Sequence, residues 1–279
     1  MRCLNPITLK TGDVVPCSQC LPCRVNRRNG WNLRLRYEST AHKTSLFVGL
    51  SYDDDNVPIT SLGNQTLREE DTIHFREKLR YRFKKDGYGG FRYYLIGEYG
   101  SQTHRPHYHL QFFTSYPIPY ENCMYAQEQD STYCLTQCFK KCPIKHIRTC
   151  WPYGHATSYP CTPADIGYIT LLHVTGLQPP TPDASPAFMR MSKKPAIGDC
   201  FFDQKELISR LYDRGNACYT YTPDGTLTPL PRYYRDKIFT KPEKEYLNVG
   251  ISENPTDVVK SHTFTNNWLR NSWKSKGKM

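Results

Sequence analysis

The segment from residue 97 to residue 113 reads GEYGSQTHRPHYHLQFF and decides the fold. The stretch from His107 onward predicts a β-strand. Successive side chains on a strand point to opposite faces, so His107 and His109 share one face, with Cβ atoms roughly 6–7 Å apart. Both imidazoles can therefore converge on one metal ion, while Tyr108 faces the opposite side of the sheet.

Residues 91–98 also predict a strand, and a connection that contains Gly, Ser and Thr links it to the histidine strand. A hairpin is the simplest arrangement of the two, and it brings Glu98 beside the histidines. Two imidazoles and one carboxylate leave coordination positions open, so a divalent metal held there can polarise a phosphodiester. Histidines also occur on strands as ordinary polar residues. From the residues alone, a metal site and a polar sheet face both stay open.

The histidine segment resembles the metal-binding motif of HUH endonucleases, which start rolling-circle DNA replication. Over most of its length, the chain more closely resembles the replication initiator proteins of small single-stranded DNA phages of the microvirus family. The matching segments occur in the same order and comprise residues 17–24, 46–53, 97–100, 105–109, 151–154, 191–198 and 230–234.

The resemblance implies an α+β fold, with an antiparallel sheet, helices on its faces and a further helix that carries a nucleophilic tyrosine. The family pattern of Tyr-x-x-x-Tyr followed by paired lysines falls on residues 164–176, where Tyr168 takes the first tyrosine position. Leu172 takes the second, and neither lysine is present. A single tyrosine cannot alternate with itself while it is covalently occupied. Tyr153 and Tyr159 are the weaker alternatives, and Tyr168 could also be an ordinary packed tyrosine.

The activity implied by the resemblance is that of a sequence-specific single-stranded DNA nickase and strand transferase. Mg²⁺ or Mn²⁺ is expected at Glu98, His107 and His109, with a 5′-phosphotyrosyl intermediate on Tyr168. The expected partners are single-stranded or nicked origin DNA and a host polymerase and helicase, in the cytoplasm of a bacterial host. The alternatives are a catalytically decayed, zinc-stapled single-stranded DNA-binding protein and a single-tyrosine HUH transposase.

The net charge of +11 favours a polyanionic partner, nucleic acid first. The 21 tyrosines, 12 phenylalanines and 4 tryptophans suit stacking on unpaired bases. Candidate phosphate contacts are Arg24, Arg27 and Arg28, on a helix expected from Pro22 to about Lys43, and Arg105 beside the histidines. The sequence contains no apolar run long enough for a transmembrane helix and no apolar signal core at its start, so neither a membrane span nor secretion is expected.

Twelve cysteines without a signal peptide indicate metal binding or free thiols rather than disulfides. Cys17, Cys20 and Cys23 form a C-x2-C-x2-C pattern, and Cys3 is the natural fourth ligand of a structural Zn²⁺. Iron–sulfur ligation and free thiols stay open. A second zinc site is conceivable around Cys134, Cys138, Cys142 and Cys150, with His146 nearby; several of these thiols could instead simply pack.

The remaining pattern predicts a strand at 46–52, a helix at about 67–85 and a helix at 203–214. Thr66 and Glu69 have the spacing of a capping box, and Phe75, Leu79 and Phe83 fall on one helical face as core. The expected organisation is a Cys-rich arm with a basic helix (1–45), an HUH endonuclease-like domain (46–254) with an irregular Cys-rich insertion at 115–162, and a basic tail (255–279).

Overall fold

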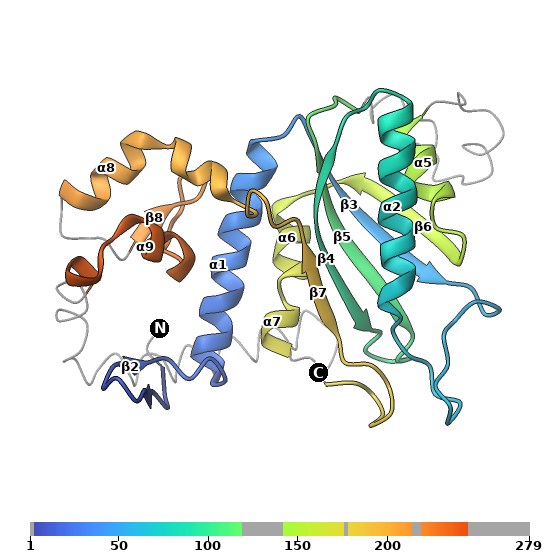
Figure 1. Ribbon diagram of the computed structural model, residues 1–279, viewed down its shortest axis with the longest axis horizontal. Helices are drawn as coiled ribbons and strands as arrows, with labels where there is room; N and C mark the ends of the chain where they lie inside the picture. The colour runs from blue at the N-terminus through green and yellow to red at the C-terminus, as the bar shows by residue number, and fades with distance from the viewer. Residues whose placement is uncertain (1–2, 119–141, 176–177, 214–218, 245–279) are drawn as a thin grey trace. The chain divides into compact units, whose positions relative to one another are not determined.

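The computed structural model describes residues 3–118, 142–175, 178–213 and 219–244. They belong to two compact units (Figure 1). One unit combines residues 1–33 with residues 202–279, and the other consists of residues 34–201. The second unit holds the main sheet.

The main sheet has five strands, and every neighbouring pair is antiparallel. Its spatial order is β6-β3-β5-β4-β7. The strand bounds are β3 (Thr44–Tyr52), β4 (Phe91–Tyr99), β5 (Pro106–Thr114), β6 (Gly154–Pro160) and β7 (Phe188–Met191). With the helices described next, this confirms an α+β fold built on an antiparallel sheet. The expected strand at 46–52 and the hairpin at 91–114 are both present.

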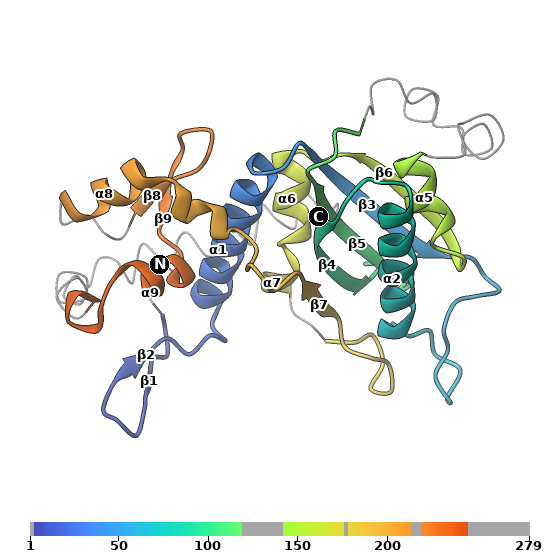
Figure 2. The same ribbon diagram turned by 45° about the horizontal axis from the view of Figure 1, so that its top comes forward.

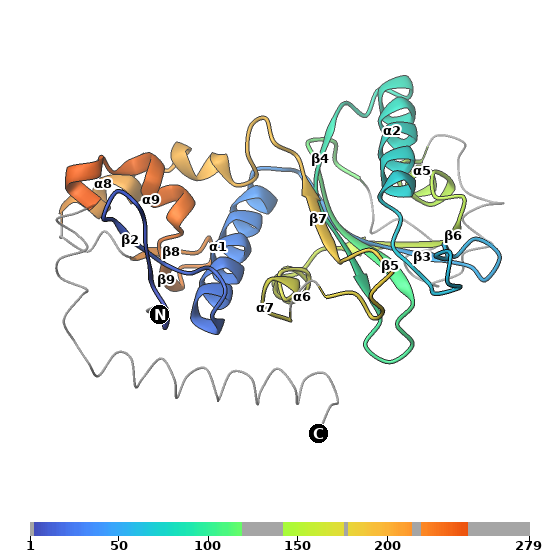
Figure 3. The ribbon, with the colours of Figure 1, turned by 60° about the horizontal axis from the view of Figure 1, so that its bottom comes forward.

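Helix α2 (Glu69–Lys85) covers one face of the sheet, as Figure 3 shows. The predicted core residues Phe75, Leu79 and Phe83 are buried, and the ring of Phe83 packs edge-on against those of Phe91 and Phe112. Such edge-to-face aromatic contacts add to the stabilisation from burial.

The expected capping box before α2 is wrong. The helix starts after Arg68 without a side-chain cap, because the Thr66 hydroxyl accepts the backbone N–H of Ser185 instead.

The other face of the sheet is covered by α6 (Pro163–Ile169), α7 (Leu172–Thr175) and the last turns of α1 (Leu21–Thr40) (Figure 2). Buried Glu38 of α1 forms an ion pair with Arg92 of β4 and accepts the N–H of Gly198 at 2.7 Å. Tyr94 is fully buried, and its hydroxyl lies 2.8 Å from Nε2 of His173 in α7. These polar contacts fix the helices on this face.

The prediction of an irregular insertion at 115–162 is wrong for its second half. Residues 143–149 form α5 (Pro143–Thr149), and β6 pairs with residues 46–52 of β3 along its whole length. Ala156 and Ser158 are buried, while the residues between them are exposed, which is the alternation of an edge strand. Gly154 starts the strand at a φ of 147°, where a Cβ would lie 2.4 Å from the backbone nitrogen of Asp53. Residues 119–141 lie outside the described part of the chain.

The first unit contains the hairpin β1 (Ile7–Thr8) and β2 (Val14–Val15), followed by the start of α1. Its C-terminal part contains α8 (Lys205–Asp213), β8 (Tyr219–Tyr221), β9 (Leu227–Pro229) and α9 (Arg232–Ile238), and a 3₁₀ helix (Asp199–Asp203) precedes α8. Helix α8 confirms the one expected at 203–214.

The division into 1–45, 46–254 and 255–279 does not coincide with the two compact units, and residues 255–279 lie outside the described part. As a domain assignment it stays a prediction. Among the described helices, none is both long and apolar enough to cross a membrane.

Candidate metal and nucleophile site

The register of the β4–β5 hairpin brings the three expected metal ligands together. Glu98 of β4 lies directly opposite His107 of β5, and His109 follows two residues later on the same face. Oε1 of Glu98 lies 3.6 Å from Nε2 of His107 and 3.5 Å from Nε2 of His109. The ligand atoms of all three residues lie within 4.8 Å of one another. His104 is not part of this group; it lies in the turn before β5, at a φ of 53°.

The protonation states of the three side chains suit metal ligation. Burial lowers the pKa of His109 to about 4, against the opposing charge of Glu98, so its imidazole is neutral at pH 7. Burial pushes the pKa of Glu98 upward, but the hydrogen bond and charge of His107 and the charge of His109 outweigh it and hold that pKa below its usual value. The pKa of His107 is raised, because the hydrogen bond to Glu98 outweighs burial. Neutral imidazole and ionised carboxylate are the forms that bind a cation.

The orientation of the histidines also fits a divalent cation. Nδ1 of His107 lies 3.0 Å from the carbonyl oxygen of Arg105. When Nδ1 carries the proton and donates it to that carbonyl, the lone pair of Nε2 is directed into the cluster. Two imidazole nitrogens and one carboxylate oxygen, with an open side toward solvent, form a donor set that Mn²⁺ or Mg²⁺ can use.

Tyr168 is positioned by the start of helix α6. Thr162 caps that helix in a complete capping box: its hydroxyl accepts the N–H of Asp165, and the Asp165 carboxylate accepts the N–H of Thr162 at 2.8 Å. Pro163 occupies the first turn, where a missing N–H costs nothing. Ile166 and Ile169 are buried, so Tyr168, between them, is left on the outer side of the helix.

The hydroxyl of Tyr168 reaches the ligand cluster. It donates a hydrogen bond of 3.0 Å to Oε1 of Glu98 and lies 3.4 Å from Nε2 of His109. The residue is nevertheless 45 % exposed, so the hydroxyl stands between the cluster and solvent. Burial of the hydroxyl and the charge of Glu98 both raise the pKa of Tyr168. A phenol beside a bare carboxylate is therefore a weak nucleophile, and positive charge at Glu98 would reverse that effect.

The structure separates Tyr168 from its alternatives. The expected helix over 164–176 is interrupted at Thr170, and Leu172, in the second tyrosine position, is 5 % exposed and turned into the core. Tyr153 lies against Trp151 and Tyr52, on the sheet face covered by α2. The position of Tyr168 beside the cluster thus has no equivalent at Leu172 or Tyr153.

Sequence reasoning missed three further residues on the site's face of the sheet, because it did not recognise β6. Phe47 of β3 contacts the rings of His109 and Tyr168 and stacks on Tyr159 of β6, with ring centroids 5.3 Å apart. Tyr159 is 40 % exposed, and its hydroxyl donates to Asp165. His155 is exposed and lies in the same cross-strand row as Ser51, His107 and Glu98.

Comparisons with known proteins agree with this arrangement. Residues 45–171, from β3 to the nucleophile helix, match the model of a family of replication-associated proteins that is named after ORF2. The chain is a relative of phage replication-associated proteins. This confirms the resemblance that its motifs indicated. No solved structure matches the chain.

Three curated phage replication-associated proteins show the extent of the similarity. Replication-associated protein VP4 of Bdellovibrio phage phiMH2K is 27 % identical over 85 % of this chain and 76 % of its own length. Replication-associated protein ORF2 of Spiroplasma virus 4 is 35 % identical over 36 % of this chain and 32 % of its own length. For replication-associated protein ORF4 of Chlamydia phage 1 the values are 28 %, 36 % and 24 %.

The four cysteines of the N-terminal arm form a second cluster of possible metal ligands. The sulfur atoms of Cys3, Cys17, Cys20 and Cys23 all lie within 4.8 Å of one another. Cys3 and Cys20 are 3.8 Å apart, well beyond a disulfide bond. The backbone turns around them so that N–H groups point at sulfur: Cys17 donates to Cys3, and both Gln19 and Cys20 donate to Cys17. Ser18 takes a φ of 62° inside this turn.

Donated N–H groups favour the thiolate form of cysteine, which is the form that binds metals. The N–H groups of Cys20 and Gln19 lower the pKa of Cys17 to about 6. Burial and the neighbouring sulfurs of Cys20 and Cys3 raise the pKa of Cys23. Four sulfurs at such distances repel one another once ionised, so the fully ionised cluster requires a cation at its centre.

The four arginines expected to contact DNA have different surroundings. Arg27 of α1 is exposed and donates to the carbonyl of Ser18 beside the cysteine cluster. Arg24 and Arg28 are half-buried on the same helix, and burial lowers the pKa of Arg28. Arg105 pairs with Asp54 at 2.7 Å and donates to the carbonyl of Tyr52 at 2.9 Å, which ties the β4–β5 turn to the end of β3.

The second cysteine group is only partly described, because Cys134 and Cys138 lie outside the described residues. Cys142 and Cys150 flank α5, but the described residues near them do not form a group of metal ligands. His146 instead pairs with Asp86, whose carboxylate lies 2.6 Å from its Nε2. His146 thus has a structural partner.

Proposed function

We propose that this phage replication-associated protein is a metal-dependent nickase of the HUH type. It would cut single-stranded origin DNA at a specific sequence and start rolling-circle replication through a 5′-phosphotyrosyl intermediate. The observation that carries this proposal is the position of the Tyr168 hydroxyl, 3.0 Å from a carboxylate that also faces two histidines. A packed tyrosine or a purely DNA-binding surface does not need that arrangement.

In the proposed reaction, the Tyr168 oxygen attacks the scissile phosphorus in line with the departing 3′-oxygen. The new bond is a phosphotyrosyl ester, the bond that breaks joins phosphorus to O3′, and the leaving oxygen takes up a proton to become a free 3′-hydroxyl. Glu98 directs the phenol proton away from phosphorus. A divalent cation held by Glu98, His107 and His109 would polarise the phosphate and stabilise the charge that develops on its oxygens. A host polymerase would extend the 3′-hydroxyl, in the cytoplasm of a bacterial host and with a host helicase.

A DNA-binding protein with decayed catalysis is the second candidate function. The observation in its favour is that Leu172 replaces a second tyrosine and is buried. Under the nickase proposal, one tyrosine initiates, and strand closure requires a second protomer or another residue. The two functions differ in one result, the formation of a covalent DNA adduct in the presence of Mn²⁺.

Tyr159 is proposed to be a stacking platform for a base next to the scissile phosphate. Its exposed ring is fixed from below by Phe47 and at its hydroxyl by Asp165. Stacking of one base on an aromatic side chain contributes about 1–3 kcal/mol to binding.

We expect Tyr159→Ala to weaken single-stranded origin DNA binding by about 10-fold or more, measured by fluorescence anisotropy. Tyr159→Phe should bind like the parent and still form the covalent adduct. Tyr219→Ala removes an equally exposed tyrosine elsewhere and is the control. Loss of the adduct in Tyr159→Phe would instead identify Tyr159 as a nucleophile.

The Cys3, Cys17, Cys20 and Cys23 cluster is proposed to bind a structural Zn²⁺. Four convergent sulfurs match the closed tetrahedral coordination of structural zinc, with ligands that backbone N–H groups already orient. In this proposal the metal holds the N-terminal arm to the start of α1, beside Arg24, Arg27 and Arg28.

Purified protein is expected to contain about one zinc ion per chain by elemental analysis. Cys20→Ser should lose most of that zinc and unfold at a lower temperature, because three sulfurs no longer close the coordination shell. Cys200→Ser, outside the cluster, is the matched control and should keep its zinc. Iron with acid-labile sulfide in place of zinc, or unchanged zinc in Cys20→Ser, would contradict the proposal.

A further inference from the structure

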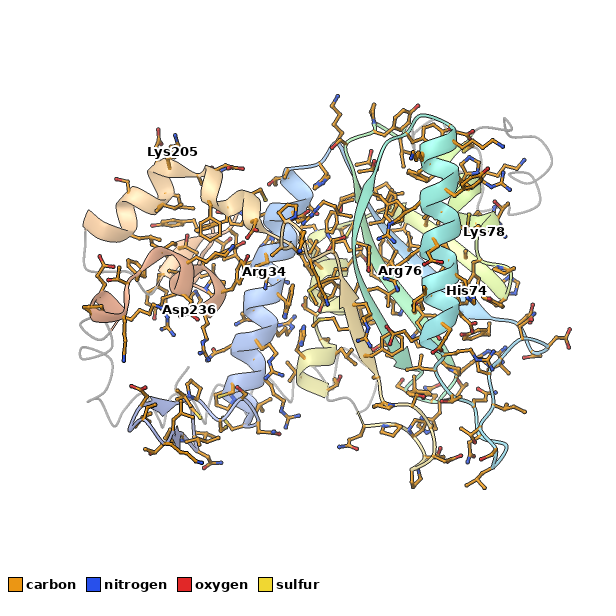
Figure 4. The ribbon with its side chains drawn as sticks, in the orientation of Figure 1. Arg34, His74, Arg76, Lys78, Lys205 and Asp236 are labelled. Carbon is orange, nitrogen blue, oxygen red and sulfur yellow. The ribbon has the colours of Figure 1, made fainter. Side chains whose placement is uncertain are left out.

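The outer face of α2 carries a basic stripe on the side of the sheet opposite the candidate site. The register fixes this relation: Glu98, His107 and His109 point to one face, while Phe112 and Tyr93 point to the other, where α2 packs. In Figure 4, His74 and Lys78 extend from the side of α2 away from the sheet, whereas Arg76 lies on the sheet side. Arg76 is accordingly buried, and the other two are exposed.

The stripe is concentrated and unneutralised. Its charged members are exposed and contain no acid between them: Lys78, Arg80, Arg82, Lys84 and Lys85. Within the described part of the chain, none of the five forms an ion pair; Arg80 lies over the rings of Phe91 and Tyr93 instead. Tyr81, in the middle of the stripe, is 63 % exposed.

This arrangement costs the helix stability. Lys78 and Arg82 are four residues apart, as are Arg80 and Lys84, and each such like-charge pair destabilises a helix by about 0.2–0.5 kcal/mol. Basic residues in a last turn are favoured by the helix dipole, which accounts for Arg82, Lys84 and Lys85. That effect does not reach Lys78 or Arg80, one to two turns earlier. An external anion is the partner that the stripe lacks.

We propose that the outer face of α2 binds the phosphate backbone of double-stranded DNA, as a second DNA contact remote from the candidate site. Lys78, Arg82 and Lys85 lie along one side over about 10 Å of helix axis, and duplex DNA carries about six phosphate charges over that length. The stripe has one exposed ring, whereas proteins that grip single strands line their grooves with several. Charge with little stacking therefore fits a duplex.

The inference rests on the proposed function only in naming DNA as the anion, and its test needs no cleavage. Binding is measured by anisotropy on a 30-bp duplex without origin sequence and on a 30-nucleotide single strand, from 50 to 300 mM KCl. The full chain carries Tyr168→Phe throughout, so that no strand is cut. The test variant is Lys78→Gln/Arg82→Gln/Lys85→Gln, and glutamine keeps the helix propensity. The control is Lys10→Gln/Lys43→Gln/Lys205→Gln, which removes the same charge from exposed positions on separate elements.

For the test variant, the slope of log K against log salt on duplex should fall by about 2 to 3, since each lost phosphate contact removes about 0.9. The control should change it by less than about 1. Thermal unfolding should be unchanged or shifted upward, because repulsion within α2 is relieved. Nicking of a short origin strand by the same variant with Tyr168 intact should match the parent. An unchanged duplex slope, an equal loss in the control, or a loss confined to the single strand would overturn the proposal.

Discussion

Tyr168→Phe is expected to abolish the covalent protein–DNA adduct and to reduce nicking by at least about 10³-fold, because it removes the atom that attacks phosphorus. The ring and its contacts with Phe47 and His109 remain, so the fold should be retained. The measurement is a denaturing gel of protein incubated with labelled single-stranded origin DNA and Mn²⁺.

Two controls make this result specific. Thermal unfolding of Tyr168→Phe should stay close to that of the parent, since the lost hydrogen bond to Glu98 is partly exposed. Tyr153→Phe, on the opposite side of the sheet, should form the adduct normally. An adduct that persists in Tyr168→Phe would show that another residue is the nucleophile.

His107→Ala/His109→Ala is expected to lose both divalent-metal binding and nicking, the latter by about 10³-fold. A metal that polarises the phosphate supplies several kcal/mol of transition-state stabilisation, and each 1.36 kcal/mol is a factor of ten. Titration calorimetry with Mn²⁺ measures the binding directly and is independent of catalysis. The parent treated with a chelator should behave like the variant and recover when Mn²⁺ is restored.

His104→Ala is the matched control, because it removes an imidazole from the same hairpin without touching the cluster. It should bind Mn²⁺ and nick like the parent. Retained Mn²⁺ binding in the double variant, with the fold intact, would mean that the cluster is a polar sheet face rather than a metal site.

The hairpin could be predicted because its information is local. One intervening residue places two histidines on the same face, and a short connection places Glu98 opposite them; both relations follow from strand geometry alone. The core face of α2 was predictable for the same reason, since a period near 3.6 is read directly from Phe75, Leu79 and Phe83.

The edge strand β6 could not be predicted in this way. It is short, begins with Gly154 and ends with Pro160, and lies among cysteines and prolines that suggested an irregular insertion. Its pairing with β3, about a hundred residues earlier, has no local signal, and with it were lost Tyr159 and His155 at the site. The Thr162–Asp165 capping box was a readable signal for the start of α6 that was overlooked.

The grouping of residues 1–33 with residues 202–279 was likewise beyond the sequence. Contacts between segments that lie far apart in the chain leave no periodicity in either segment. The cysteine cluster was predictable in contrast, because all four thiols lie within the first 23 residues and the C-x2-C-x2-C spacing limits how far apart they can be.

Mapping the DNA-linked residue tests the central claim most directly. Protein is incubated with single-stranded origin DNA and Mn²⁺, the denaturation-resistant adduct is digested with nuclease and trypsin, and the modified peptide is sequenced by tandem mass spectrometry. The chain has no Lys or Arg between Thr149 and Met189, so one tryptic peptide ending at Arg190 contains Tyr153, Tyr159 and Tyr168 together, and fragment ions must distinguish them. The phosphonucleotide is expected on Tyr168; its presence on Tyr153 or Tyr159, or the absence of any adduct from folded, Mn²⁺-loaded protein, would contradict the account.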